Sequence, residues 1–382
     1  MHSTHLLLLA SVLSLALHAS TPDQNLVAKT RDRIRANQLT AGDRKFDRIA
    51  WVPTITEALR LAKESRRPVF LLTYYGDLAI GRSCGDSTNF RAAVASNDEI
   101  IDTLNRFFVP VYRSWNELSN GGNASPEERQ EHHRIIQEAF GTKLPPRDVR
   151  AFVLNPDGHP MPADLSTSDA FRMQRGLLQV VMQLGTKPGE PLVKLRPQSV
   201  PPSLPSGALV LHTVARGAGS GSWRGYPAEN WTTLSREQLT ALLPPEPTFQ
   251  LGQIWAVDKE VAHVMLTTFY PATEEDTLKD RNVIQKISMK VRVTSIEDGI
   301  AIARLDASWS GKRSFYPGRN PDMHIDVKAE GYIRFPVDRS DVFTIALATT
   351  EAYMEDEEFT ATLEDVKEMP VLLLPKRTEA GR

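Results

Sequence analysis

The stretch GRSCGDSTNF, residues 81–90, contains the single cysteine of this 382-residue chain, and its thiol is the most reactive group that the sequence offers. One cysteine cannot form a disulfide within the chain. Cys84 is therefore a working thiol, the remnant of a site that used two cysteines, or a small apolar residue in a core. Each interpretation predicts a different environment for the sulfur.

The neighbours of Cys84 bear on its reactivity because the thiolate, not the thiol, is the nucleophile. A helix that begins near Ser87 would direct backbone amides at the sulfur and favour the thiolate. Arg82 would add a positive charge, whereas the Asp86 carboxylate would disfavour the thiolate. Such a thiolate forms mixed disulfides with partner proteins, or is oxidised to a sulfenic acid that an external thiol must reduce. We predict Cys84 as the catalytic residue, with Ser87 and Arg82 beside it.

No other set of His, Cys, Asp or Glu residues has metal-ligand spacing. A Ser-His-Asp triad assembles across a fold and so stays open, but the sequence has no Gly-x-Ser-x-Gly elbow to indicate one. His132 and His133 are adjacent in a predicted helix, so their side chains point about 100° apart and cannot share one metal ion. We expect a solvated helix face there, and we predict no metal and no cofactor. The aromatic residues of the C-terminal half could stack on a sugar or a peptide, although core packing is their more common role. They are Trp223, Tyr226, Trp231, Trp255, Tyr270 and Trp309.

Alternating helix and strand patterns surround Cys84. The apolar run VFLLTYY at 69–75 predicts a buried strand before the cysteine loop. Thr54 and Glu57 have the spacing of a capping box at the start of a helix, and so do Ser96 and Glu99. The other predicted elements are helices at 54–65, 125–140 and 168–184, a strand at 108–115, and a hairpin whose turn is Asn-Pro-Asp-Gly at 155–158.

These elements predict two domains. Residues 50–185 would form an α/β domain with a mixed sheet flanked by helices. Residues 186–207 are rich in proline and predict a semi-rigid linker. Residues 208–375 contain long alternating runs joined by turn-rich segments, which predicts an α+β, mainly antiparallel β domain. The remaining segments are a lead-in at 21–49 and a tail at 376–382.

The first 20 residues predict export. The apolar run from Leu6 to Leu17 ends near Ala19 and Ser20, which is typical of a signal peptide, although no Lys or Arg precedes it. The alternative is an uncleaved membrane anchor. No later run is long enough to span a bilayer, so we expect a periplasmic, extracellular or cell-envelope protein without a stable span after cleavage. Its 45 basic and 47 acidic residues nearly balance, so nucleic acid is not an expected partner.

The order of elements over residues 50–185 resembles the thioredoxin fold, in particular the secreted, atypical thioredoxin-like proteins that lack a CxxC pair. RRPVFLLTYY stands where such domains place the central strand, and RSCGDS stands where that strand gives way to a helix. EIIDTLNRFFVPVY resembles the helix and strand that follow, and AFVLNPDGHPM resembles the final hairpin. The second domain resembles no family that we recognise.

The working motif of that family is Trp-Cys-x-x-Cys, in which a helix N-terminus activates the first thiol. This chain has Cys-x-x-Ser at 84–87. If Cys84 occupies the first position, Ser87 replaces the resolving cysteine. If Cys84 occupies the second position, Gly81 stands in place of the nucleophile. Both alignments exclude dithiol exchange within one chain.

Two further departures affect substrate binding in the thioredoxin manner. The loop from Tyr75 to Cys84 is several residues longer than the family usually has between strand and cysteine. The family's cis-proline would fall near Val149, whereas Pro145 and Pro146 come a few residues earlier. Either the strand entry carries an insertion or the cis-proline is missing.

Two functions are compatible with these features. The first is monothiol exchange, in which Cys84 forms mixed disulfides with client proteins. The second is a non-catalytic binding or scaffold module in which the fold is only architecture. An accessible sulfur at a helix N-terminus with few apolar neighbours would favour the first, and a sulfur buried among side chains would favour the second.

Overall fold

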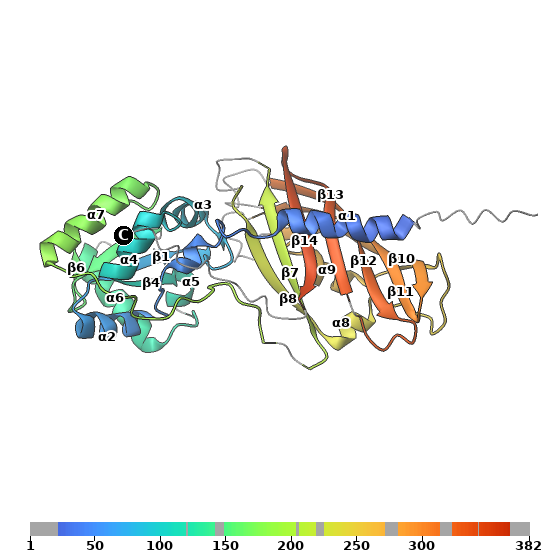
Figure 1. The fold of residues 1–382 in the computed structure, drawn as a ribbon, viewed down its shortest axis with the longest axis horizontal. Helices are drawn as coiled ribbons and strands as arrows, with labels where there is room; N and C mark the ends of the chain where they lie inside the picture. Colours follow the sequence, from blue (N-terminus) through green and yellow to red (C-terminus); the bar gives the residue numbers. More distant parts are fainter. Residues whose placement is uncertain are drawn as a thin grey trace, which may run out of the picture.

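A computed structural model describes residues 22–119, 121–141, 149–203, 206–218, 225–271, 282–313, 323–342 and 344–366. The predicted signal peptide and tail lie outside these residues. Within these ranges, no helix has the length and apolar character needed to cross a membrane. A four-stranded mixed sheet and a separate eight-stranded antiparallel sheet form two domains (Figure 1), as the sequence predicts.

The first domain is built around β1 (Val69–Tyr74), whose six residues are all buried. β1 pairs in parallel with β4 (Val109–Ser114) and antiparallel with β5 (Arg150–Leu154). The short strand β6 (Pro160–Met161) extends the sheet from β5, through the turn predicted at 155–158. The strand order is β4-β1-β5-β6. A strand buried on both faces requires helices on both sides of the sheet.

The side chains of β1 alternate between two cores. Phe70 and Leu72 pack in the core that includes apolar residues of α4 (Asp98–Phe107) and α7 (Ala170–Leu184). Val69 and Leu71 pack on the opposite face, in the core that includes residues of α2 (Ile55–Ser65) and α6 (Pro126–Phe140). The domain therefore has three layers, with the sheet between two pairs of helices.

Polar caps fix the starts of these helices. The Thr54 hydroxyl accepts a hydrogen bond from the Glu57 amide, as the spacing predicts. The prediction that Ser96 caps α4 is wrong, because the Asn97 carboxamide accepts from the amides of the first turn. The Ser96 hydroxyl instead donates to the Arg91 carbonyl.

A hairpin and a short helix fill the long loop after β1. The hairpin consists of β2 (Gly76–Asp77) and β3 (Arg82–Ser83). The helix α3 (Gly85–Asn89) continues into a π-helical turn, η2 (Phe90–Val94). The insertion that the sequence shows between strand and cysteine is therefore an ordered hairpin. The other short helices of this domain are η1 (Lys45–Arg48) and α5 (Trp115–Leu118).

The second domain is a curved sheet in which every neighbouring pair is antiparallel. Its strand order is β8-β7-β14-β13-β12-β11-β10-β9. The strands are β7 (Leu209–Gly217), β8 (Ala228–Leu234), β9 (Ile254–Ala256), β10 (Asn282–Glu297), β11 (Ile300–Arg313), β12 (Met323–Pro336), β13 (Thr344–Met354) and β14 (Glu357–Val366), and the helices between them are α8 (Arg236–Thr240) and α9 (Lys259–Leu266).

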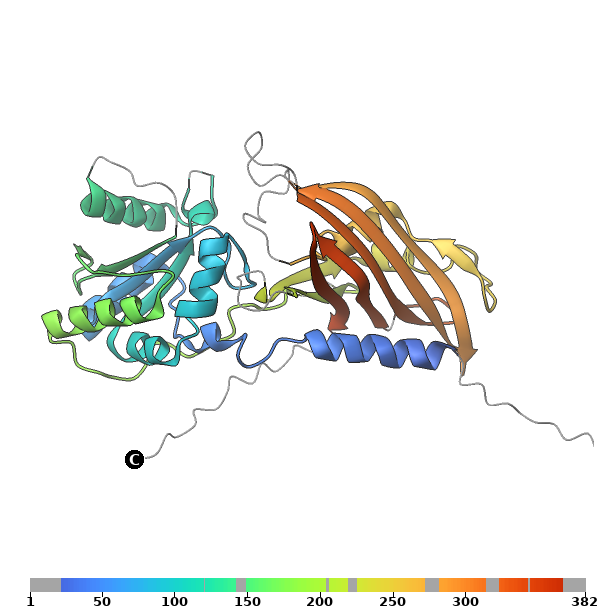
Figure 2. The same cartoon turned by 90° about the horizontal axis from the view of Figure 1, so that it is seen from above.

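Each face of this sheet is covered by a helix. On one face, Val261, Met265 and Leu266 of α9 share a large core with apolar residues of the strands. On the opposite face lies α1 (Pro22–Asn37), which runs along the sheet and contacts β11 to β14 (Figure 2). Ile34 of α1 packs there with Tyr332 and Ala346. The lead-in helix therefore belongs to the second domain, although the first domain follows it in the chain.

Buried polar contacts join the two domains. Arg44, just before η1, forms a 2.8 Å ion pair with Glu229 of β8. The same Glu229 carboxylate accepts from Ser199 in the predicted linker and lies 3.0 Å from the His212 ring. Burial raises the pKa of Glu229, but the His212 hydrogen bond and the charges of Arg44 and Arg91 outweigh this effect and hold the pKa below its usual value. Glu229 is thus charged at neutral pH.

Candidate functional site

Cys84 lies at the junction of the hairpin and α3, where it is the N-cap residue of the helix. Its Sγ atom is 2.9 Å from the Oγ atom of Ser87. Cys84 is partly exposed, whereas Ser87 is fully buried. The structure therefore brings together two of the three predicted site residues.

The backbone around Tyr75 orients this pair. The Tyr75 amide donates to the Ser87 hydroxyl oxygen over 3.4 Å, and the Cys84 amide donates to the Tyr75 carbonyl over 3.3 Å. The bond from Tyr75 uses a lone pair of the Ser87 oxygen, so the hydroxyl hydrogen can still be donated to the sulfur. A hydroxyl that donates to a thiolate favours the charged form.

The sulfur also has apolar neighbours. Cys84 packs against the core that contains Phe70, Phe90 and Leu177. The environment of the sulfur thus combines partial exposure at a helix start, which favours a reactive thiol, with contact to a core, which favours a small apolar residue.

Arg82 contacts the second domain. Its guanidinium is buried, and it donates to the carbonyls of Glu229 (2.8 Å), Thr268 (2.6 Å) and Tyr270 (3.1 Å). It also lies 5.3 Å from the centre of the Tyr270 ring, a cation–π distance. The role of Arg82 as a charge partner for Cys84 stays a prediction, whereas these hydrogen bonds attach the hairpin to the second domain.

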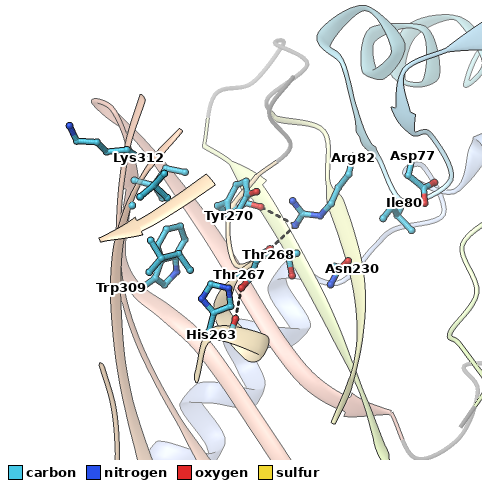
Figure 3. A pocket seen from close by; sticks show the side chains of 14 residues that line it. Asp77, Ile80, Arg82, Asn230, His263, Thr267, Thr268, Tyr270, Trp309 and Lys312 are labelled. Atoms are coloured by element: carbon cyan, nitrogen blue, oxygen red, sulfur yellow. Dashed lines mark hydrogen bonds between the residues drawn. The ribbon is translucent and has the colours of Figure 1, made fainter. Parts of the chain in front are cut away.

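A pocket of about 340 Å³ opens beside Arg82, between the two domains (Figure 3). The first domain contributes the β2–β3 hairpin, and the second contributes α9, the segment after it, and β8, β10, β11 and β12. Figure 3 shows Arg82 reaching in from the hairpin toward Tyr270, with Trp309 and Lys312 on the far wall. The lining residues are Asp77, Ile80, Arg82, Asn230, His263, Thr267, Thr268, Tyr270, Val283, Ile284, Trp309, Gly311, Lys312 and Ile325.

Two polar atoms in this pocket lack hydrogen-bond partners among the described residues. They are the indole Nε1 of Trp309 and the Oγ1 of Thr268. Trp309 is only 5% exposed, and its ring lies edge-on to Tyr270 with 5.9 Å between centroids. Buried donors are normally paired, so these two atoms indicate a place for a ligand or for water. Tyr270 and Trp309 are among the aromatic residues that the sequence offers as candidates for stacking on a ligand. Their spacing in the sequence does not show that they share a cavity with Arg82.

The histidine pair is divided between two environments. His133 is exposed, but the prediction of a solvated face is wrong for His132, which is 5% exposed. The His132 ring packs edge-on against Trp115, with 4.8 Å between centroids. Burial lowers the pKa of His132 to about 4, so the ring is neutral at physiological pH.

The other predicted features have these positions. Among the described residues, no group of three or more His, Cys, Asp or Glu side chains has the geometry to hold a metal ion. Pro145, Pro146 and Trp223 lie outside the described residues. Trp255 is buried in the core of the second domain, and its indole donates to the Leu242 carbonyl.

No protein-family model matches this chain. No curated protein has a sequence significantly similar to it. Function is therefore inferred from the geometry at Cys84 and at the interface between the domains.

Proposed function

We propose that the first domain is a thioredoxin-like domain of an exported protein and that Cys84 exchanges disulfides with client proteins through a mixed disulfide. The fold assignment is supported by the strand order β4-β1-β5-β6, with β1 parallel to β4 and antiparallel to β5. The position of Cys84 after the central strand and at the start of a helix also supports it. In this alignment Cys84 occupies the first position of the motif and Ser87 the resolving position.

One observation carries the functional proposal: the partly exposed Cys84 sulfur lies 2.9 Å from the buried Ser87 hydroxyl at a helix N-cap. The hydroxyl and the helix amides both favour the thiolate. A serine in the resolving position cannot attack a mixed disulfide. The intermediate therefore persists until a thiol from the client or from solution attacks it.

The proposed exchange conserves both atoms and electrons. The Cys84 thiolate attacks one sulfur of a client disulfide, forms a mixed disulfide and releases the other client sulfur as a thiolate. A second client thiolate then attacks the client sulfur bound to Cys84, which creates a new client disulfide and releases the Cys84 thiolate. The net reaction rearranges client disulfides without oxidation or reduction. Client disulfides are abundant in exported compartments.

The experiment that tests this proposal is alkylation of Cys84 with iodoacetamide as a function of pH. We expect a midpoint well below about 8.5, the ordinary value for a cysteine thiol. Ser87→Ala should move the midpoint upward because it removes the hydroxyl donor. Cys84→Ser serves as the unreactive control. A wild-type midpoint at or above about 8.5 would contradict the proposal.

The alternative is a binding module in which Cys84 only completes a core. The contact between Cys84 and the apolar core favours this alternative. It predicts that Cys84→Ala leaves all partner binding intact, and that no mixed disulfide accumulates when the protein is incubated with a disulfide-bonded substrate such as oxidised glutathione.

A further inference from the structure

We propose that the second domain positions the Cys84–Ser87 pair for reaction, and that Arg91 and Tyr226 are the positioning residues. This inference rests on the function proposed above, because it names what controls the reactivity of the same thiol. It is carried by the contacts that fix the chain to the second domain before the cysteine and after the helix α3.

The segment before Cys84 is fixed to strand β8 of the second domain. The Glu229 amide of β8 donates to the Ile80 carbonyl over 2.7 Å. The Arg82 guanidinium donates in the other direction, to the Glu229 carbonyl, over 2.8 Å. Arg82 is buried and stands two residues before the cysteine. The hairpin therefore cannot move relative to β8 without moving the start of α3.

The segment after α3 is fixed to the second domain by Arg91. This residue lies in the π-helical turn η2 and is only 2% exposed. Its guanidinium lies 5.3 Å from the centre of the Tyr226 ring, a cation–π distance, and Tyr226 stands two residues before β8. The same guanidinium donates to the Leu78 carbonyl, in the hairpin before Cys84, over 2.8 Å. Arg91 thus joins both ends of the cysteine segment to the second domain.

The helix between these fixed points is too short to be stable alone. α3 has five residues, and isolated helices shorter than about 12 residues are marginal in water. Figure 1 shows α3 on the side of the first domain that faces the second domain. If either end were released, the first turn of α3 would lose its fixed geometry, and with it the 2.9 Å contact between the Cys84 sulfur and the Ser87 hydroxyl. The thiolate would then lose the donors that favour it.

Tyr226 therefore influences the thiol from another domain. It acts through Arg91 and α3 on the geometry of Ser87, so a change at the domain interface is expressed as a change in the reactivity of Cys84. The second domain is the regulatory part of the protein, and the first domain is the reactive part.

Alkylation of the full chain with iodoacetamide as a function of pH tests this coupling. Tyr226→Leu keeps apolar bulk but removes the ring over Arg91, so we expect the midpoint for Cys84 to rise by about one pH unit, which corresponds to the loss of one favourable hydrogen bond. Tyr226→Phe keeps the ring and removes only the hydroxyl that donates to the Asp43 carbonyl. Its midpoint should equal that of wild type.

Three further variants separate positioning from a folding defect. Arg91→Met fills a similar space without the guanidinium and should raise the midpoint as Tyr226→Leu does. Trp255→Phe removes a hydrogen bond to the Leu242 carbonyl in the core of the second domain, so it should lower stability and leave the midpoint unchanged. In Ser87→Ala, the addition of Tyr226→Leu should raise the midpoint less than it does in wild type, because both substitutions remove the same contact.

The failure of this inference can be told apart from the failure of the thiol function. A wild-type midpoint at or above about 8.5 would overturn both. A lower wild-type midpoint that folded Tyr226→Leu and Arg91→Met both leave unchanged would overturn only the coupling. A rise in Trp255→Phe equal to that in Tyr226→Leu would also overturn the coupling, since any loss of stability would then change the thiol.

Discussion

Arg44 and Glu229 form an ion pair of 2.8 Å that is almost completely removed from solvent and connects the two domains. We predict that Glu229→Gln lowers the free energy of unfolding by about 3 kcal/mol, because it leaves the buried Arg44 charge with only the longer 3.6 Å contact to Asp47. Urea unfolding would measure this change. Glu351→Gln is the control, since it breaks the pair with Lys328 on an exposed surface, and it should have little effect. Equal effects of the two substitutions would show that the interdomain pair is not structurally important.

Buried His132 predicts a pH dependence of stability. The ring has a pKa of about 4 in the folded protein and about 6.5 when unfolded, so the unfolded state binds the proton more readily between these values. This contribution to stability is complete above pH 6.5 and is lost as the pH falls from 6.5 to about 4, by about 3 kcal/mol in total.

Denaturant unfolding at a series of pH values checks the His132 prediction. His132→Phe keeps a ring against Trp115 and should flatten the profile between pH 6.5 and 4. His133→Gln, at the exposed neighbour, should retain the wild-type profile. A profile of His132→Phe that matches wild type would assign the acid sensitivity to other groups.

At Gly81 the backbones of the two domains lie so close together that an added methyl group would push them apart. The φ of Gly81 is +72°, and a Cβ atom there would lie 2.5 Å from the Pro227 carbonyl oxygen of the second domain. Gly141 has a similar φ of +66° but open space around it. Both Gly→Ala variants should therefore lose stability, because an L residue is strained at positive φ, and only Gly81→Ala should also disturb the interface.

Hydrogen exchange at the Glu229 amide reports on that interface, because this amide donates to the Ile80 carbonyl over 2.7 Å. We expect faster exchange in Gly81→Ala than in Gly141→Ala. If the two variants protect this amide equally, the hairpin tolerates the added methyl group without moving from the second domain.

The 2.9 Å distance between Cys84 and Ser87 predicts that one substitution creates a dithiol pair. Ser87→Cys should form an intramolecular disulfide in a glutathione redox buffer, because the two side chains already meet. Mass spectrometry would detect this product as the loss of two hydrogens. Thr88→Cys is the control, since the Thr88 hydroxyl bonds to Ser83 and not to Cys84. A disulfide that forms equally in both variants would show that local flexibility, not the observed geometry, decides the reaction.

Local sequence patterns were sufficient to predict most elements of this chain. The helix start at Thr54 follows from its capping residue, and the turn before β6 follows from Asn-Pro-Asp-Gly. At α4 the same rule selected Ser96 because a glutamate lies three residues later, whereas Asn97 makes the cap. Local spacing allowed both residues, and only the path of the chain after η2 decides between them.

Features that depend on distant residues were not predictable from these patterns. Arg82 bonds to carbonyls between 147 and 188 residues away, so no spacing within its own loop indicates those partners. The burial of His132 depends on Trp115 from another helix. The pocket has walls from both domains, and its Trp309 looked like any other aromatic residue of a β-rich segment.

The position of α1 has a consequence for the order in which the chain folds. This helix begins at residue 22, but it packs on strands that end at residue 366, so the first domain is an insertion within the second. During synthesis the first domain can fold as soon as its own residues are available. The helix α1 can dock only after β14, near the C-terminal end of the described chain, has been made. We expect truncation within β14 to leave a folded first domain flanked by an unanchored helix and an incomplete sheet.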